Sequence, residues 1–283
     1  MNTQRFQKLI HTSLVAAGLL LASSGANATT QAEMEAQAAR DFAAIKASEP
    51  LTTDEDTIAY IACVANAVVD VLEPEDGSYN WEMAILETAQ LNAFVMPGGK
   101  IVVYEGILRA ARNQHQLAAV IGHEIAHVTA GHTKKRLLEG KTAEVGIQVA
   151  AVLLGGGHYG ATYTAQEMLN QGAIYAYYLP YKRANETEAD VVGLEYMAKA
   201  GFDPRAAVEL WKNMDEESGG ERPAEFASTH PSPENRMESL ISQWVEVLPL
   251  YNQAHKEGRI PDCEVPAKIQ DYYNNRQAQK EQE

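Results

Sequence analysis

The chain has 283 residues and a formal net charge of −15, and apolar side chains make up 46% of it. This length and composition suit one large or two small domains with a sizeable core, and they exclude wholesale disorder. The acidic balance disfavours a nucleic-acid partner, because binding phosphate needs clustered Lys and Arg. It also disfavours peripheral binding to anionic lipid.

Residues 1–28 have the pattern of a secretory signal peptide. Arg5 and Lys8 precede an apolar stretch at residues 14–22, and the segment ends in the small triplet Ala-Asn-Ala at Ala28. The alternative, an N-terminal membrane anchor or buried helix, is disfavoured because the apolar stretch is short for a bilayer. We therefore expect an exported, periplasmic protein cleaved after about Ala28.

Export affects the interpretation of the two cysteines, Cys63 and Cys263. An oxidising compartment favours a disulfide between them, which would close a loop of about 200 residues. The alternatives are two unrelated buried thiols or, least favoured, a catalytic cysteine, since neither residue lies in a motif with a nearby histidine. We expect the disulfide.

Helical and extended patterns alternate in the next hundred residues. Residues 31–47 are predicted to be helical, and a second helix is predicted to open at Thr53, whose side chain can cap it. Alternation at 81–85 predicts a strand, followed by short strands at 92–96 and 100–104 that a Pro-Gly-Gly turn joins. We expect the three strands to form a small antiparallel sheet.

Two later segments bear on the domain boundaries. Residues 145–154 form the most apolar stretch and predict a buried helix ended by glycine rather than a stable membrane span. Residues 271–283 are polar and predict a disordered tail. This leaves residues 29–270 as one domain, with its motifs at 80–245.

A metal-binding pattern follows Asn113, a candidate helix N-cap: His123-Glu124-Ile125-Ala126-His127. Positions i and i+4 share a helix face, so both imidazoles can reach one metal ion. Glu124 can serve as general base, as in H-E-x-x-H metallohydrolases. The alternative is a solvated helix that contains His and Glu by chance. The apolar neighbours argue against it, because buried polar groups need partners.

A catalytic zinc site takes three protein ligands, so the third must lie elsewhere. His132 is expected to point about 140° around the helix from His127, and it is predicted not to be a ligand. Glu186 and Asp190 form an i, i+4 pair, so one carboxylate can bind the metal while the other supports a ligand histidine. Glu188 projects about 200° away from Glu186 and is predicted to face solvent.

Together these segments resemble the signature blocks of one zinc-peptidase family. The blocks are residues 123–127, residues 186–190, and Thr229-His230-Pro231 with Arg236, preceded by a hallmark segment at 92–99. The family includes the eukaryotic CAAX prenyl protease, the membrane heat-shock protease and soluble periplasmic proteases of outer-membrane quality control. The chain resembles the small periplasmic branch, without the tetratricopeptide-type repeats of the β-barrel assembly-enhancing protease. The N-terminal helices and the stretch after about residue 250 match no block.

The resemblance implies a mostly helical α+β fold, a gluzincin-like core in which the small sheet flanks the H-E-x-x-H helix. It implies one Zn2+ per chain, bound by His123, His127 and Glu186. Glu124 would be the catalytic base and Asp190 would assist. His230 keeps three interpretations: it stabilises the oxyanion of the tetrahedral intermediate, it binds zinc as an inhibitory fourth ligand, or it is an ordinary loop histidine.

Substrate binding is expected at the strand that precedes the catalytic helix. An exposed strand can pair with an extended peptide through main-chain hydrogen bonds, which makes Asn92, Ala93, Phe94 and Val95 candidate substrate-binding residues. An ordinary internal strand is the alternative. Main-chain pairing ignores most side chains, so we expect unfolded or misfolded polypeptides as substrates.

The sequence therefore predicts a zinc-dependent endopeptidase of periplasmic protein quality control. Envelope or outer-membrane assembly proteins are its candidate partners. Two alternatives remain: a zinc hydrolase with a non-protein substrate, and a latent protease that acts mainly as a chaperone-like binding protein.

Overall fold

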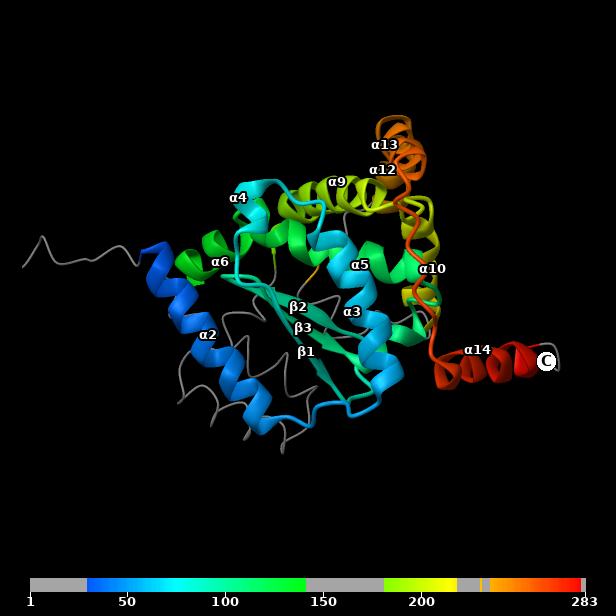
Figure 1. Ribbon diagram of the computed structural model, residues 1–283, viewed down its shortest axis with the longest axis horizontal. Coiled ribbons are helices and arrows are strands. Elements are labelled where there is room, and N and C mark those ends of the chain that lie inside the picture. The colour runs from blue at the N-terminus through cyan, green and yellow to red at the C-terminus, as the bar shows by residue number, and fades with distance from the viewer. Residues whose placement is uncertain (1–29, 141–180, 218–229, 231–234, 281–283) are drawn as a thin grey trace, which may run out of the picture.

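A three-stranded sheet lies among helices in the structure, a computed structural model that describes residues 30–140, 181–217, 230 and 235–280 (Figure 1). The predicted signal peptide and the predicted apolar helix at 145–154 lie outside these residues. No helix within the described ranges is long and apolar enough to cross a membrane. In chain order the elements are α2 (Gln31–Ser48), α3 (Glu55–Val69), α4 (Pro74–Gly77), β1 (Glu82–Leu86), β2 (Ala93–Met96), β3 (Lys100–Tyr104), η1 (Glu105–Arg109), α5 (Gln114–Thr129), α6 (His132–Gly140), α9 (Arg183–Lys199), α10 (Ala206–Glu217), α12 (Arg236–Ser242), α13 (Trp244–Lys256) and α14 (Ala267–Lys280).

The sheet is mixed, which corrects the predicted antiparallel arrangement. β2 and β3 are antiparallel, and the turn between them uses Gly98 and Gly99, both at positive φ. β1 runs parallel to β3, with Glu82 opposite Lys100, so the strand order is β1-β3-β2. Residues 87–92 form a connection between β1 and β2 rather than a tight turn, and β3 occupies the place between the two strands.

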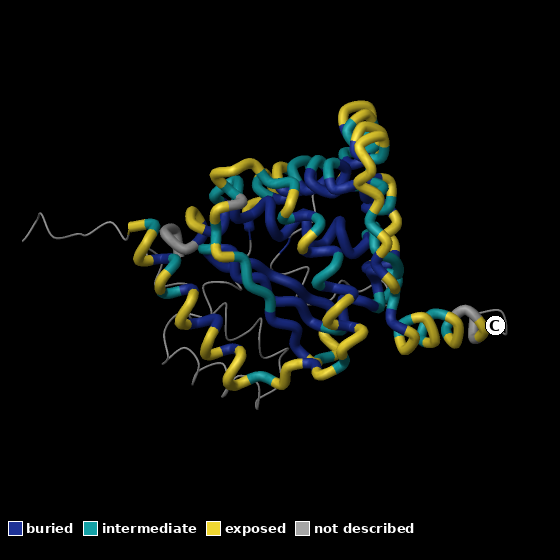
Figure 2. Tube along the Cα trace, in the orientation of Figure 1, coloured by how far each residue is buried: buried dark blue, intermediate teal, exposed yellow. Residues whose placement is uncertain are grey.

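The two faces of the sheet pack into two different cores, one formed with odd-numbered and the other with even-numbered strand residues. Odd-numbered strand residues such as Val95 and Val103 belong to the larger core with α3 and α5. Even-numbered residues such as Phe94 and Val102 pack with α2. Figure 2 shows most of the sheet and of α5 buried, with the outer side of α2 exposed. The sheet is thus covered on both faces, which fits the apolar character of its strands.

Side-chain caps fix the start of two helices. α3 begins one residue later than predicted, because Asp54 rather than Thr53 accepts hydrogen bonds from the backbone N–H groups of Asp56 and Thr57. Asn113 caps α5 as predicted, and its side chain accepts from two N–H groups in the first turn. α5 is then buried along most of its length, so its polar residues lie inside the core.

α5 and α9 cross at a pair of glycines. A Cβ atom on Gly122 would lie 2.8 Å from the carbonyl oxygen of Gly193, and one on Gly193 would lie 2.8 Å from the backbone nitrogen of His123. Only a residue without a Cβ atom allows this close approach. The crossing brings Glu186 and Asp190 of α9 against the face of α5 that carries the H-E-x-x-H residues.

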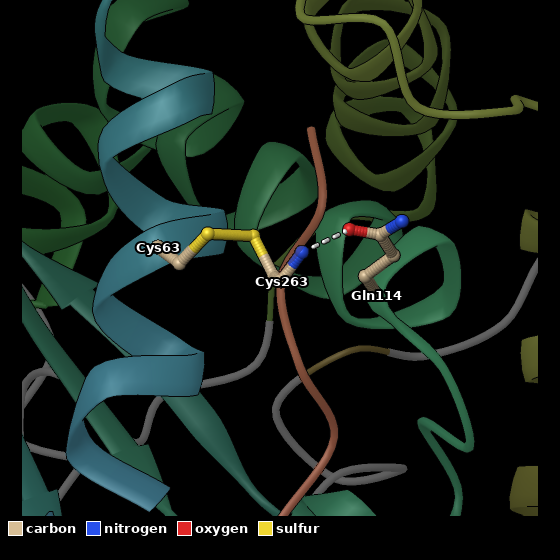
Figure 3. The surroundings of a disulfide bond; sticks show 3 residues. All are labelled: Cys63, Gln114 and Cys263. Atoms are coloured by element: carbon tan, nitrogen blue, oxygen red, sulfur yellow. Dashed lines mark hydrogen bonds between the residues drawn. A yellow bond between two sulfur atoms is a disulfide. The ribbon is translucent and has the colours of Figure 1, made fainter. Parts of the chain in front are cut away.

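The predicted disulfide is present. Cys63 on α3 is bonded to Cys263, with Cα atoms 5.8 Å apart, and the backbone N–H of Cys263 donates to the Gln114 side chain (Figure 3). The bond therefore ties the segment before α14 to α3, beside the start of α5.

Residues 271–280, predicted to be disordered, instead belong to α14 (Figure 1). The hydroxyl of Tyr273 donates to the carbonyl of Leu108, and the hydroxyl of Tyr272 donates to Glu217 on α10. Arg276 forms an ion pair with the same Glu217, whose side chain is only 3% exposed. These partners lie far away in the sequence, so the polar composition of the tail gave no sign of the helix.

Candidate metal centre

Four buried side chains converge on one point in the described structure. His123 and His127 come from α5, Glu186 from α9, and His230 from the segment before α12; one potential ligand atom of each lies within 4.8 Å of the others. His127 Nε2 is 3.1 Å from His123 Nε2 and 3.3 Å from Glu186 Oε1. The three predicted ligands are therefore brought together, with His230 as a fourth member.

The donor set fits a divalent cation. The Glu186 carboxylate is fully buried, and neither of its oxygens accepts a hydrogen bond from a described residue. Burial alone would raise the pKa of Glu186, but the charge of His230 and the adjacent imidazoles outweigh it and hold that pKa well below its usual value. A buried carboxylate that is near imidazoles but lacks well-aligned hydrogen bonds is costly, and a metal ion bound among them removes that cost. Two imidazoles and a carboxylate form a common catalytic zinc set.

Glu124 lies beside this cluster. It is fully buried, and its Oε1 is 3.3 Å from His230 Nε2. Burial raises the pKa of Glu124, although the charges of His230 and His123 partly oppose the shift. A carboxylate with a raised pKa is suited to accept and return a proton, so both position and environment fit the predicted base.

A chain of ionic contacts holds His123. Its Nδ1 is 3.0 Å from Asp190 Oδ1, and Asp190 accepts a hydrogen bond of 2.6 Å from Arg236, whose guanidinium lies 3.4 Å from the ring centre of Trp211. Burial lowers the pKa of His123, but the carboxylates of Asp190 and Glu186 outweigh it and raise that pKa to about 9. Asp190 thus occupies the supporting position that the sequence predicts.

Stacking holds His127. Its ring lies 3.7 Å from the Tyr181 ring, centre to centre and nearly parallel, and the Arg136 guanidinium lies 3.7 Å from the Tyr181 ring centre. The Nδ1 of His127 is 3.1 Å from His132 Nδ1. Burial lowers the pKa of His127 well below its usual value, and Glu186 opposes the shift only in part.

The expected direction of His132 is wrong, because α5 does not continue to it. α5 ends at Thr129, Gly131 has a φ of 71°, and α6 begins at His132, so the imidazole lies against His127. His132 is not among the four converging residues, in keeping with its predicted role as a non-ligand. Glu188 has a 60% exposed side chain, as predicted, yet its Oε2 is 3.1 Å from His132 Nε2.

Several residues of the site were not identified from the sequence. Gly122 and Gly193 carried a signal, since glycine inside a helical pattern marks close packing. Tyr181, Arg136 and Trp211 carried none, because their stacking partners come from other segments of the chain.

The candidate substrate strand, β2, lies at an edge of the described sheet, but its side chains are buried. The N–H of Tyr104 donates to the carbonyl of Asn92, so the ladder alternation directs the backbone groups of Ala93 and Val95 away from β3. The Asn92 side chain accepts from the Ala93 N–H. Since Phe94 is only 3% exposed, substrate binding there depends on main-chain groups and stays a prediction.

Comparison with known proteins places these residues in one context. The model of peptidase family M48 matches residues 55–243. The mitochondrial metalloendopeptidase OMA1 of Schizosaccharomyces pombe is 36% identical over 190 residues, which cover 67% of this chain and 53% of that protein. Human mitochondrial metalloendopeptidase OMA1 is 32% identical over 190 residues, which cover 63% of this chain and 36% of that protein. The β-barrel assembly-enhancing protease of Escherichia coli is 27% identical over 224 residues, which cover 75% of this chain and 44% of that protein. The chain spans about half the length of these relatives, or less.

Proposed function

Since the chain belongs to peptidase family M48, we propose that it is a zinc-dependent endopeptidase of the bacterial periplasm. By that membership it is a metallopeptidase. Its proposed substrates are unfolded or misassembled envelope proteins, and its proposed role is protein quality control. The observation that carries the proposal is the buried convergence of His123, His127 and Glu186 beside Glu124.

The geometry supports a proposed task for each residue. His123, His127 and Glu186 would hold the zinc, which when bound supplies Lewis acidity toward water and the scissile carbonyl. Glu124 accepts the proton of the attacking water and delivers it to the leaving amine. Asp190, 3.0 Å from His123, holds that ligand in place.

His230 gives a specific reason to consider latency. Its Nδ1 is 3.3 Å from both His123 Nε2 and Glu186 Oε1. Catalytic zinc sites keep one position open, whereas a fourth protein ligand closes the site. We propose that His230 is this inhibitory ligand and that its withdrawal opens the site.

The substrate and the location have weaker support. The Schizosaccharomyces pombe and human relatives are named metalloendopeptidases, which supports polypeptide substrates. The name of the Escherichia coli relative refers to β-barrel assembly, which supports envelope or outer-membrane assembly partners. The pattern of residues 1–28 supports export, whereas OMA1 is mitochondrial. Fractionation of cells that express the full chain tests the location, with a periplasmic signal expected and a cytoplasmic one contradicting it.

The test of activity is degradation of casein, a loosely folded protein, by the zinc-loaded chain. Glu124→Gln removes the base but no metal ligand, so cleavage should fall about 10²- to 10⁴-fold while the zinc content stays unchanged. A chelator should abolish cleavage as well. Cleavage by Glu124→Gln at the wild-type rate would show that Glu124 is not the base.

Latency predicts a distinct pattern in the same assay. His230→Ala should cleave faster than the wild type, because the fourth ligand position is then open to water. If neither the wild type nor His230→Ala cleaves casein, a panel of non-protein ester and amide substrates tests whether the chain is a zinc hydrolase with a non-protein substrate. Binding of unfolded casein by both proteins without any hydrolysis would favour the chaperone-like alternative.

A further inference from the structure

Two residues on the outer side of His127 have no part in the proposed mechanism. His132 Nδ1 is 3.1 Å from His127 Nδ1, and His132 Nε2 is 3.1 Å from Glu188 Oε2. His132 is 4% exposed, whereas the Glu188 side chain is 60% exposed. A row of three side chains therefore leads from the ligand cluster to the surface.

The hydrogen positions in this row follow from the direction of His127. Its Nε2 faces His123 Nε2 and Glu186, so Nε2 is the atom available to a metal. A neutral imidazole that binds through Nε2 carries its proton on Nδ1, and that N–H can donate only to an acceptor. His132 Nδ1 must then be the acceptor, which places the proton of a neutral His132 on Nε2, where it donates to Glu188.

The local backbone holds His132 in this place. Gly131, at a φ of 71°, ends the path of α5 and lets α6 begin at His132. The hydroxyl of the next residue, Thr133, donates to the carbonyl of His127 at 3.3 Å. Both ring nitrogens of His132 have a partner within 3.1 Å, so its imidazole is held between His127 and Glu188.

We propose that His132 is a positioning residue: with Glu188 behind it, it fixes the tautomer and ring orientation in which His127 binds the metal. Ligand histidines usually donate their second N–H to a carboxylate or a carbonyl, and loss of that partner costs roughly 10- to 100-fold in metal affinity. Here an imidazole stands between the ligand and a surface carboxylate. The proposal rests on the metal site of the proposed function, so its test measures zinc binding rather than peptide cleavage.

The experiment is competition for zinc between a chromophoric chelator and the full chain. His132→Leu keeps the bulk but removes the acceptor, so zinc affinity should fall about 10- to 100-fold. His132→Asn keeps an acceptor near the Nδ1 position and should stay within roughly fivefold of the wild type. Glu188→Ala should bind zinc about as tightly as His132→Asn, because each variant loses only the contact between residue 132 and residue 188. The control is His115→Leu on α5, the helix of His127. The partner of His115 is the Asp203 N–H, so the zinc affinity of this variant should be unchanged.

A second readout is ¹⁵N NMR of the zinc-loaded protein, which should place the His132 proton on Nε2. A proton on Nδ1 would overturn the proposal. So would His132→Leu binding zinc as tightly as the wild type, or His132→Asn binding it as weakly as His132→Leu. If the wild type itself binds no zinc, the proposed function fails and this inference fails with it.

Discussion

His123 and His127 lie one turn apart on α5, yet the protein holds them by different means. Three ionic or cation–aromatic contacts in series hold His123: Asp190 at 3.0 Å, Arg236 on Asp190 at 2.6 Å, and Trp211 under Arg236. His127 is held instead by the stacked Tyr181 ring and by His132 at its Nδ1.

The electrostatic results of the two arrangements are opposite. The carboxylates near His123 outweigh its burial and raise its pKa to about 9, whereas burial dominates at His127 and lowers its pKa well below the usual value. A metal binds only neutral imidazole. The ionic side therefore sets how metal binding depends on pH, and the stacked side sets the position of a ligand that is already neutral.

The largest effect is expected from Asp190→Asn on the ionic side. The substitution removes the carboxylate 2.6 Å from the buried Arg236 and leaves only that of Glu186 at 3.6 Å, and breaking a buried ion pair costs roughly 3–5 kcal/mol of folding free energy. It also replaces the charged partner of His123 by a neutral amide, so zinc affinity should fall by about 10- to 100-fold. Urea denaturation and chelator competition measure the two losses.

A surface ion pair provides the matched control. Asp203 and Arg205 are 2.6 Å apart, and the Arg205 side chain is 55% exposed. Asp203→Asn should therefore cost at most about 1 kcal/mol of stability and leave zinc affinity unchanged. Equal losses in Asp203→Asn and Asp190→Asn would contradict a special role for the buried pair.

A smaller effect is expected in the pH dependence of zinc binding. Metal-free His123 is protonated at neutral pH, because its pKa is about 9, so zinc must displace that proton. Apparent zinc affinity should rise with pH and gain nothing more from His123 above about 9. His127 is already neutral at these pH values, so it releases no proton when zinc binds. Proton release on zinc addition, followed with a pH indicator in weak buffer, should be smaller in Asp190→Asn, and equal release would contradict the assignment.

The same raised pKa affects the metal-free fold. A group that binds its proton more tightly in the folded state stabilises the fold below its unfolded pKa, about 6.5 for histidine. That contribution of His123 should be lost as the pH rises through about 9.

The smallest effect is expected from Tyr181→Phe on the stacked side. The ring that stacks on His127 remains, and only the hydroxyl contact of 3.0 Å with Thr133 is lost. Stability should fall by about 1 kcal/mol, and zinc affinity should stay within roughly threefold of the wild type. Tyr181→Leu, which removes the aromatic ring, should weaken zinc binding more. A loss in Tyr181→Phe as large as in Asp190→Asn would show that the hydroxyl, not the ring, supports His127.

The two sides also differ in how far the sequence predicts them. His123, His127, Glu186 and Asp190 were predictable because the i, i+4 relation is a local property of one helix. The same rule failed for His132, since α5 ends at Thr129 and His132 begins a new helix. Gly131 was the available signal, as glycine commonly ends helices.

Features that depend on distant partners were not predictable. Alternation within β1 indicates which side chains share a face, but it does not identify β3 as the parallel neighbour. Polar composition predicted a disordered tail, whereas Tyr273 and Arg276 fix α14 through Leu108 and Glu217. In each case the deciding contact joins segments whose proximity only the folded chain establishes.

The most direct test of the account is calorimetric titration of the metal-free chain with zinc. If His123, His127 and Glu186 form the site, the wild type should bind one zinc ion per chain, and Glu124→Gln should bind it equally. Glu186→Gln removes a charged ligand and should bind zinc at least about 100-fold more weakly. One tightly bound zinc ion in Glu186→Gln, with the affinity of the wild type, would contradict the proposed site.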